Sequence, residues 1–171
     1  MRNFEDHIDA CRYALENHTG DIVEIGAGLA ESTKHFLRLA AEFNRKVLVI
    51  DPFESGWNEM PESYGKPYPL VGFHANVKAH KDRLTIHQRS SLCLTSDLKC
   101  HETEIAFAYI DGLQLHGAVL NDLKIVNHAR LICVDDMNRI TTDSQVVSAV
   151  NEFVIRHEKQ LIIKDQWAFI Q

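Results

Sequence analysis

The chain has 171 residues, of which 45% are hydrophobic, and it carries a formal net charge of −6 at pH 7. That length and apolar content suit one domain with its own hydrophobic core, so we expect a single domain over residues 1–171. The acidic balance and the lack of a basic run, a leader-like start or an apolar run of about 20 residues argue against nucleic acid and membrane partners and favour a cytoplasmic protein.

The first half of the chain alternates between helical and extended patterns. Apolar residues at spacings of three and four indicate a helix within the N-terminal segment 1–19, which Gly20 ends. A second helix has Ser32 or Thr33 at its capping position. The pattern predicts a helix at 4–16, a strand at 21–26, a helix at 32–43 and a strand at 46–51.

Residues 52–69 do not fit a regular element. They hold all four prolines of the chain together with Trp57, Tyr64 and Tyr68. Loops of this length in compact domains are usually functional or disordered. The aromatic side chains favour a lid that orders over bound ligands.

The second half continues the alternation and ends in two short extended runs. This spacing predicts an α/β domain whose sheet is largely parallel, with its ligand site at the carboxyl ends of the strands. The pattern predicts a helix at 70–81, strands at 83–88 and 104–111, a helix at 116–129, a strand at 130–136, a helix at 143–159 and terminal strands at 160–165 and 166–171.

Polar residues gather where these strands end. Buried strands do not end in carboxylates without a reason, and parallel strands share one carboxyl edge. We therefore expect this edge to be the functional one. The residues at the strand ends are Asp51, Ser90, Asp111, Asp135 and Asp136.

The segment VEIGAGLAES, residues 23–32, joins a strand to a helix through two glycines. Gly26 and Gly28 would allow a tight turn and a close approach of the backbone to a ligand. The complete dinucleotide-binding pattern is missing, because Glu31 stands at its last position and a carboxylate competes with phosphate for the positive end of the helix. Together with Glu24, this favours a cationic or zwitterionic ligand.

Asp51 closes the second strand, at about the distance from the glycine loop that nucleoside-binding sheets show. In such sheets an acid at this place accepts hydrogen bonds from the ribose hydroxyls. The alternative is an aspartate that only stabilises a turn or caps a helix. The glycine loop ahead of it favours the ribose interpretation.

Several segments together resemble the class I S-adenosylmethionine-dependent methyltransferases. VEIGAGLAEST resembles the first cofactor motif, VIDPFESG the strand-and-acid motif, and YIDGLQLHGAVLNDL followed by LICVDDM the paired carboxylate motifs. Over residues 20–171 the chain is similar to the small family of macrocin-type O-methyltransferases and cephalosporin hydroxylase-like proteins, and more distantly to catechol O-methyltransferases. The resemblance implies a Rossmann-like, doubly wound α/β fold with a mostly parallel sheet, helices on both faces and a terminal antiparallel strand.

The resemblance also implies a site for S-adenosylmethionine. Three positions depart from the family pattern: Ala30 replaces the usual third glycine, Ser90 stands where an acid often contacts the adenine amine, and Gln114 stands where a potential base often lies. The implied cofactor contacts are Glu24, Gly26, Gly28, Asp51 and, at the end of the fourth strand, Ser90 and Ser91.

A divalent ion, usually magnesium, is implied at Asp111, Asp135 and Asp136. The strands that end in Asp111 and Asp135 are joined by one helix, so a right-handed crossover would make them neighbours. Three close carboxylates repel one another unless a cation lies among them, and an all-oxygen ligand set selects magnesium, calcium or manganese over zinc. The alternative is that Asp135 and Asp136 stabilise a turn and cap the next helix.

The leading hypothesis is a metal-dependent O-methyltransferase that acts on a hydroxyl of a small molecule of sugar, phenol or polyketide type. Asp111 or His116 would serve as the base, although a histidine at a helix start is more often a surface or capping residue. The alternatives are a non-catalytic binding or accessory protein and a nicotinamide-dependent dehydrogenase. A homo-oligomer is compatible with the sequence.

The cysteines show no C-x-x-C spacing, so we expect free thiols rather than a disulfide or a zinc site. They are Cys11, Cys93, Cys100 and Cys133.

Overall fold

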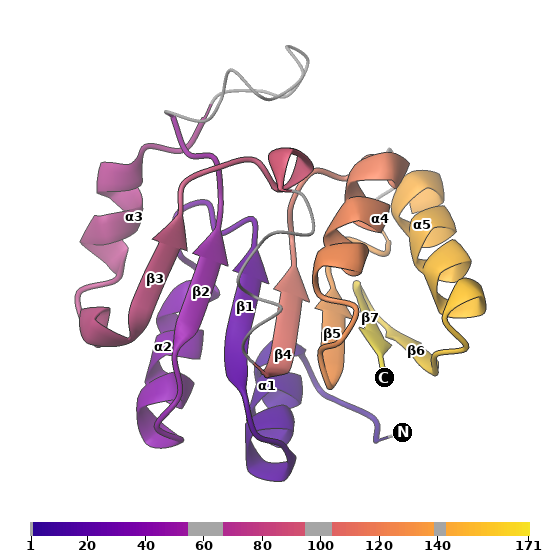
Figure 1. Ribbon diagram of the computed structural model, residues 1–171, viewed down its shortest axis with the longest axis horizontal. Coiled ribbons are helices and arrows are strands. Elements are labelled where there is room, and N and C mark those ends of the chain that lie inside the picture. The colour runs from indigo at the N-terminus through magenta and orange to yellow at the C-terminus, as the bar shows by residue number, and fades with distance from the viewer. Residues whose placement is uncertain (1, 55–66, 95–103, 139–142) are drawn as a thin grey trace.

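A computed structural model describes residues 2–54, 67–94, 104–138 and 143–171. In these residues seven strands form one sheet in the order β3-β2-β1-β4-β5-β7-β6 (Figure 1). The strands are β1 (Asp21–Ile25), β2 (Val47–Ile50), β3 (Leu84–His87), β4 (Ile105–Ile110), β5 (Leu131–Val134), β6 (Leu161–Lys164) and β7 (Trp167–Ile170).

The sheet is mostly parallel. Strands β1 to β5 pair in parallel, whereas β7 runs antiparallel to both β5 and β6. The predicted fold class is therefore confirmed, including the antiparallel strand at the C-terminal end of the sheet. The chain winds outward in one direction from β1 through β2 to β3 and in the other from β4 to β5. The switch point, where ligands bind in such sheets, lies between β1 and β4.

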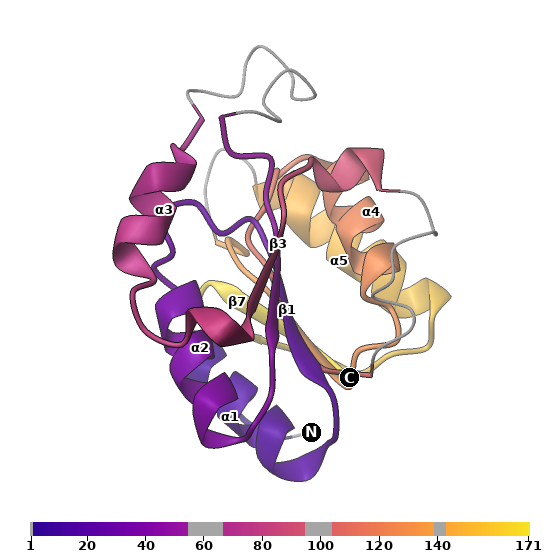
Figure 2. The same ribbon diagram turned by 60° about the vertical axis from the view of Figure 1, so that its left-hand side comes forward.

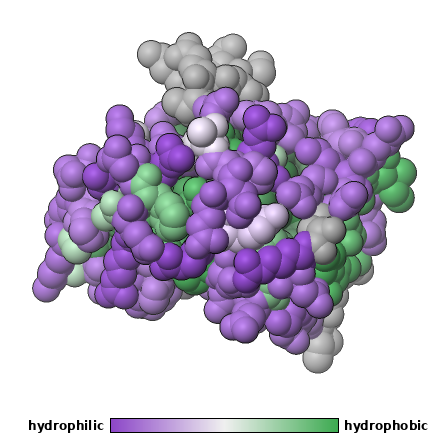
Figure 3. All heavy atoms as spheres, turned by 90° about the horizontal axis from the view of Figure 1, so that it is seen from below, coloured by the Kyte–Doolittle hydropathy of each residue, from purple (hydrophilic) through white to green (hydrophobic). Residues whose placement is uncertain are grey.

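Helices cover both faces of the sheet, and each face has its own apolar core (Figure 2). The helices on one face are α1 (His7–Asn17), α2 (Thr33–Glu42) and α3 (Leu70–Asn76), and those on the other are α4 (His116–Ile125) and α5 (Asp143–Arg156). Two short 3-10 turns, η2 (Lys81–Arg83) and η3 (Ser91–Cys93), flank β3. Hydrophilic side chains cover most of the face at the amino edge of the sheet, opposite the switch point (Figure 3).

Four helix boundaries lie three or more residues from their predicted positions. Helix α5 ends at Arg156 rather than at 159, and the other three differences have a physical reason. Helix α1 begins at His7, because the Asp6 carboxylate accepts hydrogen bonds from the amides of the first turn, at 2.8 Å each. Helices α3 and α4 end earlier than the apolar pattern predicts. Val77 and Val126 lie beyond the two helix ends and are nevertheless buried. The helix-like spacing of apolar residues in the sequence therefore extends past the last helical residue.

Two smaller predictions are also corrected. Ser90 and Ser91 follow β3, the third strand along the chain rather than the fourth. Ser32 stands at the start of α2, but its side chain makes no capping hydrogen bond.

The strand register brings the site residues to one level. Ile25 pairs with Ile50 on one side and with Ile110 on the other. The ladder extends one residue further, because the Gly26 amide donates to Ile50 O at 3.0 Å and the Asp111 amide donates to Ile25 O at 2.9 Å. The glycine loop, Asp51 and Asp111 therefore leave the sheet side by side. No helix in the described part of the chain is long and apolar enough to cross a membrane.

Candidate functional site

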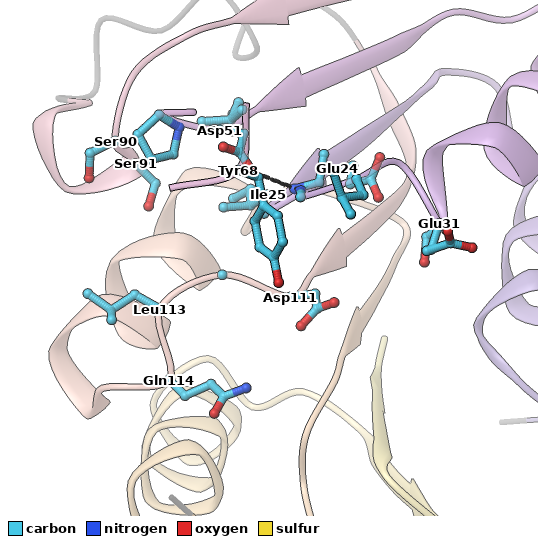
Figure 4. A pocket seen from close by; sticks show the side chains of 18 of the residues that line it. Glu24, Ile25, Glu31, Asp51, Tyr68, Ser90, Ser91, Asp111, Leu113 and Gln114 are labelled. Atoms are coloured by element: carbon cyan, nitrogen blue, oxygen red, sulfur yellow. Dashed lines mark hydrogen bonds between the residues drawn. The ribbon is translucent and has the colours of Figure 1, made fainter. Parts of the chain in front are cut away.

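A cavity of about 440 Å³ opens at the switch point, at the carboxyl ends of β1, β2 and β4 (Figure 4). Its volume lies in the range of small-molecule sites. The residues that line it are Glu24, Ile25, Gly26, Ala27, Gly28, Leu29, Glu31, Ser32, Ile50, Asp51, Pro52, Tyr68, Ser90, Ser91, Leu92, Asp111, Gly112, Leu113 and Gln114. All the predicted cofactor residues are among them.

The charge of the cavity has one sign. Four carboxylates line it, and none of the described lining residues is a lysine, an arginine or a histidine. Glu24 and Glu31 lie at one end, and Ser90, Ser91 and Leu113 lie at the other (Figure 4). The cavity is therefore suited to a ligand with a cationic part and an uncharged part, and unsuited to a pyrophosphate.

The backbone conformation of the loop after β1 requires glycine at position 26. Gly26 has a φ of +84°, and a Cβ added there would lie 2.2 Å from the carbonyl oxygen of Asp111. No side chain fits at that distance, so only glycine allows β1 to turn away beside β4. The tight turn predicted from the sequence is present.

Asp51 holds this loop in place. It is only 7% exposed, and its Oδ2 accepts hydrogen bonds from the amides of Ala27 (2.8 Å) and Gly28 (3.0 Å). Its Oδ1 accepts one from the amide of Phe53 at 2.7 Å. The turn-stabilising alternative thus describes part of its role. A carboxylate oxygen has two acceptor sites, so Oδ1 retains one for a ligand hydroxyl.

Glu24 is a buried acid beside the loop. It is 1% exposed, and its Oε2 accepts a hydrogen bond from the Thr33 hydroxyl at 2.6 Å. Burial raises the pKa of Glu24 to about 8, and the charges of Asp111 and Asp51 act in the same direction, whereas the Thr33 hydrogen bond opposes them. Glu24 is therefore mostly neutral at pH 7, and a cation placed beside it would favour its charged form.

Pro52 and Tyr68 are the described residues of the predicted lid that line the site. The ring of Tyr68 lies over Gly28, 3.5 Å from the position that a Cβ would take there. The tyrosine itself is 52% exposed. Trp57 and Tyr64 lie outside the described residues, so the lid stays a prediction.

The three predicted metal ligands are not brought together. Asp135 Oδ2 accepts a hydrogen bond from the Tyr109 hydroxyl at 2.5 Å, and Oδ1 accepts one from the amide of Asp136 at 2.7 Å. Asp136 is buried in a left-handed turn with a φ of +64°, and of the three aspartates only Asp111 lines the cavity. Across the described ranges, no cluster of three or more acidic, histidine or cysteine side chains is arranged to hold a metal ion.

His116 does not reach the cavity. It begins α4, and its Nε2 lies 3.2 Å from Glu152 Oε2 of α5. It is absent from the cavity lining, which supports the surface interpretation over a role as base.

Three further residues near the site were not singled out from the sequence. The His7 ring stacks on Tyr109, with ring centroids 4.8 Å apart, and its Nε2 lies 3.1 Å from the Ser32 hydroxyl. These contacts join distant parts of the chain, so no local pattern predicts them. Asp122 lies on the buried side of α4 and is fully buried. Its position on the apolar face of the predicted helix 116–129 was the signal that could have identified it from the sequence.

None of the three described cysteines forms a disulfide bond with another described cysteine. Cys11 and Cys133 are buried and Cys93 is exposed, while Cys100 lies outside the described residues.

No protein-family model matches the chain, and no curated protein matches it in sequence. Solved structures match its fold. CalS11, a TDP-rhamnose 3'-O-methyltransferase of calicheamicin biosynthesis, has a TM-score of 0.73 at 16% identity over 96% of this chain and 77% of its own. The O-methyltransferase TomG from Streptomyces achromogenes, in complex with S-adenosylmethionine (SAM), has a TM-score of 0.64 at 12% identity over 95% and 76%. The methyltransferase PaMTH1 from Podospora anserina, bound to S-adenosylhomocysteine (SAH), has a TM-score of 0.61 at 12% identity over 96% and 76%. The chain therefore has the fold of the class I methyltransferases.

Proposed function

We propose that the protein transfers a methyl group from SAM to a hydroxyl oxygen of a small molecule. The observation that carries this proposal is the cavity at the switch point of a methyltransferase fold, lined by four carboxylates and no described basic side chain. SAM carries a net positive charge, from a cationic sulfur and an ammonium group against one carboxylate, together with an uncharged adenine, which suits the acidic and uncharged ends of the cavity. The structural neighbours TomG and PaMTH1 hold SAM and SAH, respectively.

Different residues of the cavity would contact different parts of the cofactor. Glu24, charged when a cation lies beside it, would pair with the positive end of the cofactor. Asp51 would accept a ribose hydroxyl on Oδ1 while Oδ2 keeps the glycine loop closed. Ser90 and Ser91 would contact the adenine. Bound SAM supplies a methyl group that is already activated by the positive charge of its sulfur.

Asp111 is the residue in position to accept the proton of the acceptor hydroxyl. Its side chain is exposed, lines the cavity and stands at the end of β4 beside the glycine loop. A general base must lie within hydrogen-bond reach of the proton that it takes, and Asp111 would meet that condition for an alcohol bound in the cavity beside it. The acceptor would be a sugar, a phenol or a polyketide hydroxyl.

The metal ion of the original hypothesis does not fit this arrangement of side chains. Each oxygen of Asp135 accepts one protein hydrogen bond, Asp111 alone of the three aspartates lines the cavity, and the described residues offer no three-ligand cluster. The proposal therefore includes no step at a metal ion. Metal dependence remains a prediction that can be tested separately, by transfer in EDTA.

The test has two stages. Calorimetry with SAH should show saturable binding, and NAD serves as the matched control because its pyrophosphate should be rejected by the acidic cavity. Incubation with methyl-labelled SAM and a pool of hydroxylated metabolites should then label a product. Binding of SAH without transfer would favour the accessory-protein alternative. Failure to bind SAH would contradict the proposal, and tight binding of NAD would favour the dehydrogenase.

A further inference from the structure

Helix α4 carries a buried acid that the proposed chemistry does not use. Asp122 of α4 is 0% exposed. Neither of its carboxyl oxygens has a hydrogen bond of ordinary geometry in the described residues, and the Ser91 hydroxyl is the side chain that interacts with it. An acid buried without a basic partner is costly to keep, so its retention needs an explanation.

Asp122 lies behind two loops of the cavity. A Cβ added at Gly112 would lie 3.2 Å from Asp122 Oδ2, which places the carboxyl against the turn after β4. On its other side it meets Ser91 of η3, the turn after β3. The neighbouring Asn121 donates from Nδ2 to the Ser91 carbonyl oxygen at 2.8 Å. Consecutive residues of α4 thus hold the carbonyl and the hydroxyl of one serine that lines the cavity.

These loops form the uncharged end of the cavity. Ser90 and the η3 residues Ser91 and Leu92 line it together with Gly112 and Leu113, whereas Glu24 and Glu31 lie at the far end (Figure 4). An apolar wall with hydroxyl groups suits a flat heteroaromatic ring, which stacks on the apolar side chains and hydrogen-bonds at its rim.

We propose that Asp122 is a positioning residue for the cofactor, which fixes the spacing between η3 and the Gly112 turn so that the adenine of SAM fits between them. This inference rests on the proposed function and adds a residue outside the cavity that shapes its adenine end. Burial raises the pKa of Asp122 to about 7 while Ser91 opposes the shift, so the acid is largely neutral below that pH and can share a proton with the Ser91 hydroxyl.

The test compares two neighbouring buried positions of α4. In Asp122→Leu the volume is kept and the polar contact is lost. We expect the Kd for SAH and for adenosine to rise about five- to tenfold, because Ser91 loses its polar neighbour and η3 is no longer held at its distance from the Gly112 turn, while the melting temperature stays equal or rises. In turnover the KM for SAM should rise by the same factor, with kcat and the KM for the acceptor unchanged.

The matched control is Leu123→Ala, which removes core packing at a residue that is also 0% exposed. It should lower the melting temperature and leave SAH affinity within twofold. Asp122→Asn should rescue binding, and Ser91→Ala should weaken it without adding to Asp122→Leu in the double variant.

SAH affinity within twofold of wild type in Asp122→Leu would overturn the inference, as would an equal affinity loss in Leu123→Ala. A wild-type chain that binds no SAH would contradict the proposed function itself, and this role with it.

Discussion

The carboxylates at the two sides of the switch point stand at equivalent strand ends and have different surroundings. On the side of β1 and β2, Glu24 and Asp51 are buried and line the cavity, and Asp51 receives three backbone amides. On the side of β4 and β5, Asp111 is exposed to the cavity, whereas Asp135 is held by the Tyr109 hydroxyl.

The sheet topology determines at which strand end an acid lies, and the hydrogen-bond donors around it determine whether its carboxylate contacts a ligand or the protein. The Asp51 carboxylate organises the loop against which a ligand would lie. Asp135 faces a tyrosine on the adjacent strand, because Tyr109 and Cys133 are paired across β4 and β5 and side chains two residues apart share a face. Each of its two oxygens therefore accepts a hydrogen bond from a protein donor. The predictions below test this contrast, beginning with the largest expected effect.

The buried side should make the protein less stable as the pH rises. The pKa of Glu24 is raised to about 8 in the folded chain from an ordinary value of 4.5. Its contribution to stability is therefore complete below about pH 4.5 and is lost as the pH rises through 8, with a full loss of roughly 4–5 kcal/mol. Denaturant unfolding between pH 5 and 8.5 measures this slope.

Two variants decide whether Glu24 is the cause. Glu24→Gln should remove about half of the slope, because the pKa of Asp122 is also raised, to about 7, and should account for a comparable part. The exposed Glu31 is the control, and Glu31→Gln should leave the slope as it is. If Glu24→Gln keeps the wild-type pH dependence of stability, then a group other than Glu24 takes up the proton on folding.

The glycine loop should be the least tolerant backbone of the site. Gly26→Ala combines an unfavourable φ with a Cβ 2.2 Å from the Asp111 carbonyl oxygen, so we expect a loss of about 3–4 kcal/mol in the free energy of unfolding. Gly117, in the first turn of α4, meets no atom within 4 Å, and Gly117→Ala should be neutral or stabilising by up to about 1 kcal/mol. Equal stabilities for the two variants would show that the loop is not held against β4.

Asp51 tests the buried side for both of its roles. Asp51→Ala leaves three amides without an acceptor, so we expect a stability loss of about 3 kcal/mol and at least tenfold weaker SAH binding. Asp51→Asn keeps one acceptor oxygen and should fall between wild type and Asp51→Ala in both measurements. Lower stability with an unchanged Kd would show that Asp51 only closes the turn.

The fold was largely predictable from the sequence because the signals are local. Apolar runs that end in Gly26 or Asp51 predict strands that end at a common edge, and all seven predicted strands are present. The ends of α3 and α4 were predicted too late, since Val77 and Val126 are buried without being helical. The spacing of apolar residues indicates which positions are buried, and at the ends of α3 and α4 the buried positions continue beyond the last helical residue.

The site was predictable only in part, because its chemistry depends on partners far away in sequence. The composition of the glycine loop indicated an acidic cavity, and the cavity has that character. The fate of Asp135 depends on Tyr109, which lies 26 positions earlier and reads as an ordinary strand residue. A hydrogen bond between two strands is invisible until their register is known, so three aspartates that looked equivalent are used in different ways.

Tyr109→Phe gives the smallest expected effect and the sharpest test of the side formed by β4 and β5. It removes one hydrogen bond to a carboxylate, worth about 1–2 kcal/mol of stability, and frees Asp135 Oδ2.

If that bond sets the role of Asp135, then methyl transfer by the wild type should survive EDTA, and Mn²⁺ binding measured by calorimetry should be weak in the wild type and stronger in Tyr109→Phe. Asp135→Asn is the paired variant: it alters the same bond, so combining it with Tyr109→Phe should cost little additional stability. Loss of wild-type transfer in EDTA and recovery with magnesium would mean that Asp135 leaves Tyr109 when an ion arrives, and it would restore the original metal prediction on this side of the switch point.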